Sequence, residues 1–158
     1  MTDGRAADLY ERDFVAWTRA QVSALRRLAE SRPNEPAVDF PHLIEEIADL
    51  GKSERDAVRS HVRTIIEHCL KLRHSAANDP RAAWMSTIGR TRTALEDKLS
   101  PSLRRDLRVQ LPRLYAQARR DAGRDLALFG EPDAAAALPD ASPFSLDQLL
   151  RHDWYPSR

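Results

Sequence analysis

The stretch 40-FPHLIEEIADLGKSERDAVRSHVRTIIEHCLKLRH-74 decides the fold, because it holds the longest helical period in the sequence. At about 100° per residue, its apolar side chains fall on one broad face of a helix. This phase is kept across Gly51, so we expect one helix over about 41–73, with Gly51 allowing a close backbone approach. The alternative is a break at Gly51 and a new helix capped by Ser53. The residues of the face are Leu43, Ile47, Leu50, Val58, Val62, Ile65, Ile66, Cys69 and Leu72.

A column of polar residues falls on this apolar face. Glu54, His61 and His68 follow one another at seven-residue spacing in line with Ile47, and Glu46 lies at the edge of the face. Burial of unpaired polar groups is costly, so we expect these side chains to meet partners from other helices. Two interpretations stay open: a buried network that fixes helix register, or a ligand site inside a bundle.

The spacing of the histidines argues against a metal site. Residues seven apart on a helix are separated by about 10.5 Å, so His61 and His68 do not share one ion unaided. The sequence contains no His-x-x-His, His-x-x-x-His or Glu-x-x-His pattern. His42 and Glu46 lie one turn apart and are expected as a surface pair. We expect no metal and no other cofactor.

Length and composition indicate one all-α domain. A chain of 158 residues is long enough to bury about 70% of the surface of its unfolded state. No window alternates apolar and polar residues in the manner of a strand. We expect a single helical-bundle domain over residues 1–158, with four main helices over about 7–32, 41–73, 80–99 and 101–129, and a short C-terminal helix over 145–152.

The first predicted helix carries aromatic residues at helical spacing. Tyr10, Phe14 and Trp17 share one face, and we expect them to anchor the core. Asp13 lies beside that face; we expect it in solvent, with a bond to a partner as the alternative.

The third and fourth predicted helices begin at similar signals. Asp79-Pro80 and Ser100-Pro101 each place an N-cap residue before a proline in the first turn. Pro112 predicts a kink or break near 109–112. On the third helix we expect buried Trp84, Ile88, Leu95 and Leu99, with Arg81, Arg90 and Arg92 on the opposite face.

The C-terminal part follows a Pro/Ala-rich excursion, with one turn expected around Ala134–Leu138. Ser145 and Gln148 form a capping-box pattern, and Phe144 and Leu149 fit a hydrophobic staple.

Charge is nearly balanced over the whole chain, but separate segments carry opposite net charges. The net charge is +1, whereas residues 81–124 carry eleven Lys/Arg against four Asp/Glu and residues 30–56 carry three against eight. We favour an acidic element facing a basic one, with a nucleic-acid surface as the alternative. The arginines of 104–124 circle their helix, which argues against a phosphate-tracking stripe.

The N-terminus is charged and lacks the apolar core of a signal peptide, and no uncharged run approaches the length of a membrane span. Cys69 is the single cysteine and lies on the apolar face, where an inert buried thiol is expected. These features predict a cytoplasmic protein without a membrane partner.

Several segments together carry a family resemblance: LYERDFVAWTRAQ, HLIEEIADLGKSERDAV, HCLKL, LYAQARRDA and SPFSLDQLLRHDWYP. In their order and spacing the chain resembles the bacterial family catalogued as domain of unknown function 29. The resemblance implies a compact all-helical domain and no particular activity. It also suggests that the polar positions Asp13, Glu46, Glu54, His68, Lys71, Tyr115 and Arg119 belong to the family pattern.

The functional hypotheses are ordered by what the sequence lacks. It has no phosphate-cradling Gly-rich loop, G-x-S-x-G elbow, zinc signature or Cys–His nucleophile pattern, so an enzyme is disfavoured. The leading hypothesis is a non-catalytic module that binds a protein partner or self-associates. Alternatives are a small-ligand or metal-binding, even enzymatic, bundle and a nucleic-acid-associated protein using residues 81–124. The candidate polar cluster is Glu46, Glu54, His61, His68, Lys71, Tyr115 and Arg119, with Arg119 expected to pair with Glu46 or Glu54.

Overall fold

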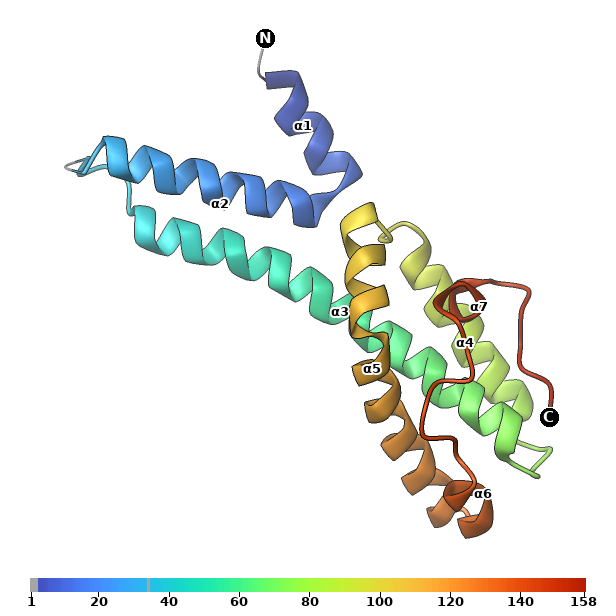
Figure 1. The fold of residues 1–158 in the computed structure, drawn as a ribbon. Coiled ribbons are helices and arrows are strands. Elements are labelled where there is room, and N and C mark those ends of the chain that lie inside the picture. Colours follow the sequence, from blue (N-terminus) through green and yellow to red (C-terminus); the bar gives the residue numbers. More distant parts are fainter. Residues whose placement is uncertain (1–2, 34) are drawn as a thin grey trace. The chain divides into compact units, whose positions relative to one another are not determined.

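A computed structural model of the chain describes residues 3–33 and 35–158, and these residues form seven helices and no strand (Figure 1). The all-α prediction is therefore confirmed, and four of the helices are long. The helices are α1 (Asp3–Arg12), α2 (Phe14–Ser31), α3 (Phe40–His74), α4 (Arg81–Glu96), α5 (Pro101–Leu128), α6 (Pro132–Ala136) and α7 (Leu146–Leu150).

The chain divides into two compact units. Unit 1 takes the described residues up to Ala57 together with Ser100–Arg105, and unit 2 takes Val58–Leu99 and Asp106–Arg158. α1 and α2 thus belong to unit 1, and α4, α6 and α7 belong to unit 2. α3 and α5 contribute residues to both units. A single domain over residues 1–158 stays a prediction.

The first predicted helix, over about 7–32, is wrong. In unit 1 the structure has two helices there, separated at Asp13. The side chain of Asp13 caps α2 by accepting a hydrogen bond from the Ala16 N–H at 3.0 Å. Its other oxygen accepts from the Ser102 N–H at 2.9 Å, in the first turn of α5. A short polar side chain that satisfies free N–H groups competes with helix continuation, which the apolar period does not report.

Asp13 is also buried, with 7% of its surface exposed, so the expectation of a solvated aspartate is wrong. Burial alone would raise the pKa of Asp13, but the hydrogen bonds from Ala16, Ser102 and Ser100 outweigh it and lower the pKa below its usual value. One carboxylate therefore serves the starts of two helices and remains charged.

α3 is continuous through Gly51, as the unbroken helical phase predicts. The predicted close approach is confirmed as well: a Cβ atom on Gly51 would lie 2.3 Å from Thr18 Oγ1 and 3.2 Å from Thr18 Cβ. Thr18 is buried, and its hydroxyl donates to the Val15 carbonyl. α2 and the first part of α3 thus form a tight antiparallel hairpin, joined through residues 32–39 (Figure 1).

The aromatic residues of unit 1 pack on one another and do not anchor a core. The ring centroids of Tyr10 and Trp17 lie 4.9 Å apart, and those of Phe14 and Trp17 lie 5.7 Å apart. Tyr10 is exposed, and Phe14 and Trp17 are only partly buried. The predicted anchoring is wrong because α2 turns its other face, with Val15, Thr18 and Val22 buried, toward the rest of the unit.

Unit 2 contains most of the apolar core. Arg59 of α3 and Asp106 of α5 form a two-point ion pair beside it, with distances of 2.8 and 2.6 Å. Both α4 and α5 contribute at least two fully buried side chains, and the segment after α6 adds more. The buried apolar residues include Val62, Ile65, Ile66, Cys69, Leu70, Ile88, Leu95, Leu107, Tyr115, Ala118, Leu126, Phe144 and Leu149.

The starts of α4 and α5 differ. Ser100 Oγ accepts from the Leu103 N–H at 3.3 Å, which confirms its predicted capping role. Asp79 does not cap α4: the residue before that helix is Pro80, already in a helical conformation, and no side chain caps the helix there. The Arg81 N–H donates instead to the Asn78 carbonyl, so a tight turn replaces the expected cap. α5 continues through Pro112, so the break that was one form of the prediction is absent, and a kink there stays a prediction.

The C-terminal signals are confirmed. Ser145 Oγ accepts from the Gln148 N–H at 3.1 Å, and Gln148 Oε1 accepts from the Ser145 N–H at 2.9 Å, which completes the capping box of α7. α6 lies where one turn was expected.

Gly51→Ala tests the contact between α2 and α3. Alanine favours a helix by about 1 kcal/mol over glycine, but its Cβ overlaps buried Thr18, so we expect a net loss of about 1–2 kcal/mol in the free energy of unfolding. Urea denaturation measures this change. Gly89→Ala is the matched variant. A Cβ atom at Gly89 would lie 3.7 Å from its nearest neighbour, Tyr155 Oη, so the added methyl group has room and the variant should be more stable than the wild type. Adding Thr18→Ala to Gly51→Ala should recover the loss, and no recovery would contradict the steric explanation.

Candidate functional site

Lys71, a member of the predicted polar cluster, is buried and has two carboxylate partners. It is buried on α3, and its Nζ donates to Glu67 at 2.7 Å and to Asp125 of α5 at 2.5 Å. Burial alone would lower the pKa of Lys71, but the two carboxylates outweigh it and raise the pKa above its usual value. Lys71 therefore stays protonated, which is the opposite of what a nucleophilic lysine needs.

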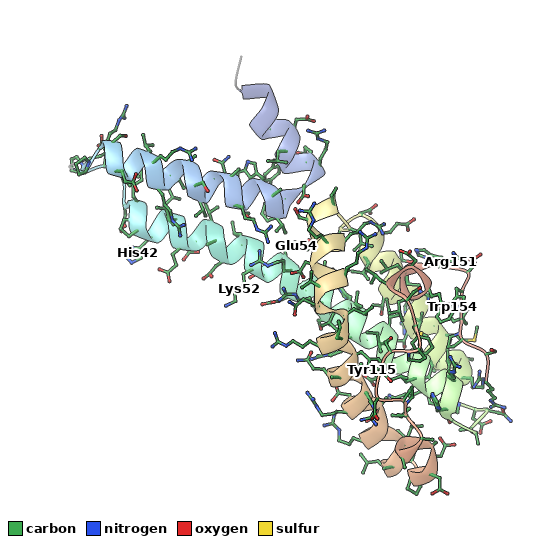
Figure 2. All side chains as sticks on the ribbon, in the orientation of Figure 1. His42, Lys52, Glu54, Tyr115, Arg151 and Trp154 are labelled. Carbon is green, nitrogen blue, oxygen red and sulfur yellow. The ribbon has the colours of Figure 1, made fainter. Side chains whose placement is uncertain are left out.

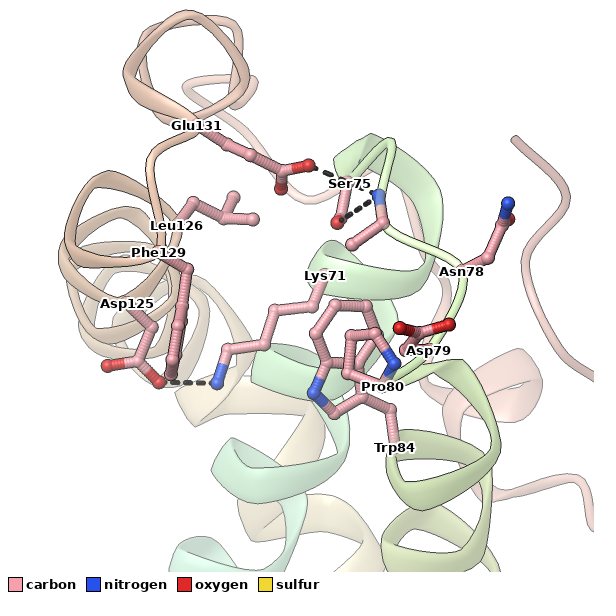
Figure 3. Close-up of a pocket in the computed structure, with 11 residues that line it drawn as sticks. Lys71, Ser75, Asn78, Asp79, Pro80, Trp84, Asp125, Leu126, Phe129 and Glu131 are labelled. Atoms are coloured by element: carbon pink, nitrogen blue, oxygen red, sulfur yellow. Dashed lines mark hydrogen bonds and ion pairs between the residues drawn. The ribbon is translucent and has the colours of Figure 1, made fainter.

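Beside Lys71 lies a pocket of about 500 Å³ in unit 2 (Figure 3). Leu126 of α5 and Phe129 just after α5 form one wall, and Pro80 just before α4 and Trp84 of α4 form the other. The remaining lining residues are Lys71, Ser75, Ala77, Asn78, Asp79, Asp125 and Glu131.

The loop after α3 is held against this pocket by Glu131. Its Oε1 accepts hydrogen bonds from the N–H groups of Ala76 and Ala77, at 2.9 and 3.2 Å. The Ser75 hydroxyl accepts from the Ala77 N–H at 3.1 Å (Figure 3). These bonds give partners to the backbone N–H groups that follow α3 and hold the loop in place at the edge of the pocket.

The pocket lining combines charged and aromatic side chains. It contains neither histidine nor cysteine, and its hydroxyl and charged groups are those of Ser75, Lys71 and three carboxylates. Among the described residues, no three His, Cys, Asp or Glu side chains gather closely enough to hold a metal ion. Charge and aromatic surface are what it offers a ligand.

The predicted column of Glu54, His61 and His68 does not line this pocket. Glu54 belongs to unit 1, whereas His61 and His68 belong to unit 2, and all three are partly buried. His68 Nδ1 lies 2.9 Å from the Thr64 carbonyl of its own helix. Whether the column is a network or a site stays a prediction.

Glu46 and His42 lie on the exposed surface of unit 1. His42 pairs with Asp39 at 2.6 Å and not with Glu46. Figure 2 labels the His42 side chain near the start of α3.

Tyr115 and Arg119 hold the segment that follows α6. The Tyr115 hydroxyl donates to the Pro139 carbonyl at 2.5 Å, and Arg119 donates to the Leu138 carbonyl at 3.0 Å. Figure 2 labels Tyr115 on α5. Arg119 also pairs with Asp140. The predicted pairing of Arg119 with Glu46 or Glu54 is therefore wrong, because the returning chain supplies nearer acceptors. Burial raises the pKa of Tyr115.

Arg92 has a role that the sequence analysis missed. It was expected on an exposed face, yet only 1% of it is exposed. Its guanidinium donates to the carbonyls of Leu149 and Trp154, both at 2.8 Å, and lies 5.2 Å from the centre of the Tyr155 ring. The C-terminal segment covers α4 at Arg92, which no helical period in α4 could reveal.

Two further buried groups carry no chemistry suited to a site. Burial raises the pKa of the Cys69 thiol to about 12, so it is inert as expected. His74 has a buried Nε2 without a hydrogen-bond partner, and burial followed by the charge of Arg73 lowers its pKa.

Comparison with known proteins gives the family of the chain and a similar structure. Residues 9–155 match the family described as Domain of unknown function DUF29. The chain belongs to this family. A crystal structure of an α-helical protein of unknown function from Rhodospirillum rubrum, at 1.45 Å resolution, is similar to this DUF29 chain, with 29% identity and a TM-score of 0.79. The match covers 92% of this chain and 90% of that protein.

No curated protein matches the DUF29 chain. Over its described part, none of the helices combines the length and the apolar character needed to cross a membrane. The family and the similar structure name no activity, so functional conclusions rest on the geometry of the chain itself.

Arg92→Lys tests the anchor of the C-terminal segment. Lysine offers a point charge in place of a planar fork and cannot reach the carbonyls of Leu149 and Trp154 together. We expect a loss of about 2–4 kcal/mol in the free energy of unfolding, measured by urea denaturation, and faster trypsin cleavage after Arg151. Arg90→Lys, at an exposed position of the same helix, is the control and should match the wild type. Equal stability of both variants would refute the anchor.

His74→Phe tests the unpaired ring nitrogen. The folded pKa of His74 is lowered, so the unfolded chain binds a proton first as the pH falls through about 6.5, and stability decreases there. We expect His74→Phe to lose this decrease between pH 7.5 and 5.5 and to gain about 1 kcal/mol at neutral pH, both measured by urea denaturation. His42 has a raised pKa and contributes with opposite sign, so the difference between the two proteins is the quantity to follow. Identical pH dependence would exclude His74 as the source.

Proposed function

We propose that this chain is a non-catalytic interaction module, and that the hairpin of α2 and the first part of α3 binds a second copy of the chain. The observation that carries the proposal is the apolar surface of the hairpin. Leu28 of α2 is 40% exposed, and Leu43 and Leu50 of α3 are 40% and 52% exposed. Large apolar side chains that gather on one exposed face commonly mark a protein interface.

α2 carries two adjacent apolar seams, each with heptad spacing. The first seam contains the buried Val15, Thr18 and Val22 and contacts the rest of unit 1. The second, open seam is offset by about 100° around the helix. Phe14 and Trp17 at its start pack on Tyr10 of α1, whereas Ala24 and Leu28 are exposed. A helix with two such seams is typical of a bundle in which it has two neighbours. The open seam contains Phe14, Trp17, Gln21, Ala24 and Leu28.

The open seams of the two helices lie on the same side of the hairpin. On α3, Leu43 and Leu50 lie about 90° around the helix axis from the buried Phe40 and Gly51. Viewed along the chain direction, this rotation has the same sense as the rotation from the buried seam to the open seam on α2. Equal rotational senses on antiparallel helices point to one common side. α2 and α3 therefore share a single two-helix face.

The area of this face fits a weak dimer. A helix of 18 residues is about 27 Å long, and two adjacent helices are about 20 Å wide, so each copy offers roughly 500 Å². Two copies would bury roughly 1,000 Å², at the lower end of the range for specific interfaces. We expect a dimer whose population depends on concentration in the micromolar range.

Charge favours a second copy in which α2 of one chain lies on α3 of the other. α2 carries three arginines against one glutamate, and residues 40–57 carry two Lys/Arg against five Asp/Glu. A two-fold axis parallel to the helices places the basic helix on the partner's acidic helix twice, which is the self-complementary pattern of an isologous dimer.

The contact of Thr18 with Gly51 fixes the register of this arrangement. With a two-fold axis parallel to the helices, each residue keeps its level along the bundle. Trp17 is then within about 3 Å of the level of the partner's Leu50, and Leu28 is within about 3 Å of the level of the partner's Leu43. On the outer side, Arg27 approaches the partner's Glu46. The result is a four-helix bundle built from two hairpins.

The arginine-rich segment 81–124 offers less to a nucleic acid than its composition suggests. Arg92 and Arg119 donate to backbone carbonyls of unit 2, and Arg81 donates to the Leu72 carbonyl at 2.7 Å. Arg124 pairs with Asp121. These internal partners support a protein-binding function over a polynucleotide-binding one.

Substitution of Leu43 and Leu50 by glutamate tests the dimer. Charged side chains on the face cannot be buried without partners, so the double variant should be monomeric where the wild type forms dimers. Sedimentation velocity from 1 to 200 µM measures the populations. Val109→Glu is the control, because Val109 is a strongly exposed apolar residue of unit 2 and its loss should leave dimerisation unchanged.

A charge exchange tests the pairing of the helices. Arg27→Glu and Glu46→Arg should each weaken dimerisation, and the two together should restore much of it. Wild-type protein that stays monomeric at 200 µM would overturn self-association. If the wild type dimerises but the double variant with both charges exchanged does not regain dimerisation, the arrangement with a two-fold axis parallel to the helices would be overturned.

A further inference from the structure

We propose that the pocket beside Lys71 binds an organic cation: an ammonium or guanidinium group carried on a small apolar body. This site is independent of the hairpin, because all of its residues belong to unit 2. Its volume of about 500 Å³ lies within the range of roughly 300–1,000 Å³ that is typical of small-molecule sites.

Two aromatic rings suit the site to an apolar body and to a cation. Trp84 and Phe129 stand on opposite walls of the pocket, with the stem of Lys71 between them (Figure 3). Phe129 is 82% exposed although it lines a pocket, so a ligand would remove its ring from water. The faces of such rings attract ammonium and guanidinium groups.

The charge of the lining favours a cation. Lys71 is its one basic residue, against the three carboxylates of Asp79, Asp125 and Glu131. Glu67 adds a further carboxylate at the Lys71 ammonium group. The positive charge of Lys71 is thus already matched, and the excess of the lining is negative.

The same arrangement disfavours other ligand classes. An anion would meet no unmatched cationic side chain, because Lys71 donates to both Glu67 and Asp125. The carboxylates are spread around the pocket, and no metal-sized cluster forms among the described residues. An organic cation can contact separated carboxylates and aromatic walls at once, which a small ion cannot.

The test uses three compounds of nearly equal shape that differ in charge: phenethylammonium, 2-phenylethanol and phenylacetate. The indole N–H signal of Trp84 in a ¹H–¹⁵N NMR spectrum reports binding, and those of Trp17 and Trp154 are internal references. We expect phenethylammonium to move the Trp84 signal with saturation, 2-phenylethanol to bind at least tenfold more weakly, and phenylacetate not to bind. The affinity should fall at high salt.

Two variants and a matched control test the location. Phe129→Ala removes an exposed ring, and Asp79→Asn removes an exposed charge, so both should fold and should weaken phenethylammonium binding at least fivefold. Leu128→Ala is the control, because Leu128 is strongly exposed beside Phe129 but does not line the pocket. Its affinity should equal that of the wild type.

Three outcomes would overturn the inference. Absence of any shift at Trp84 would exclude the site, and equal affinity for 2-phenylethanol would show that charge has no part in it. Equal weakening by Leu128→Ala and Phe129→Ala would place the effect outside the pocket. The oligomeric state does not enter these measurements, so failure here is distinguishable from failure of the dimer.

Discussion

The close approach of α2 and α3 at Thr18 and Gly51 is the contact on which the N-terminal unit depends. Since glycine has no side chain, Thr18 can lie where a Cβ atom would otherwise be. This contact sets both the rotation and the level of the two helices. It thereby decides which apolar residues are enclosed in the hairpin and which, such as Leu43 and Leu50, remain exposed.

In the second unit, polar side chains hold irregular chain against helices. Arg92 and Arg119 donate to carbonyls of the segments around residues 148–154 and 138, and the Tyr115 hydroxyl donates to residue 139. Chain outside helices and sheets leaves backbone carbonyls without partners, and buried carbonyls need donors. A guanidinium has several donors in one plane and can serve several carbonyls at once. Part of the high arginine content therefore has a structural explanation.

Much of the helical structure could be predicted from local patterns. The long period of residues 40–74, the capping box at Ser145 and the cap at Ser100 are properties of short stretches, and all three are present. Asp13 and Arg92 were misjudged for a common reason. Each role depends on another segment: Ser102 for Asp13 and the C-terminal chain for Arg92. Asp79 differs, because a local turn between Asn78 and Arg81 replaces its cap.

The sequence by itself determined the class of fold, the main helices and the close approach at Gly51, because helical period and capping are local in the chain. Only the tertiary structure decided which faces are covered and which polar groups meet. It separated Glu54 from His61 and His68 between two units, and it brought Trp84 and Phe129 to one pocket beside Lys71. Contacts between residues distant in sequence arise from packing. The helical period of one segment shows which face is apolar, but it does not show which other segment covers that face.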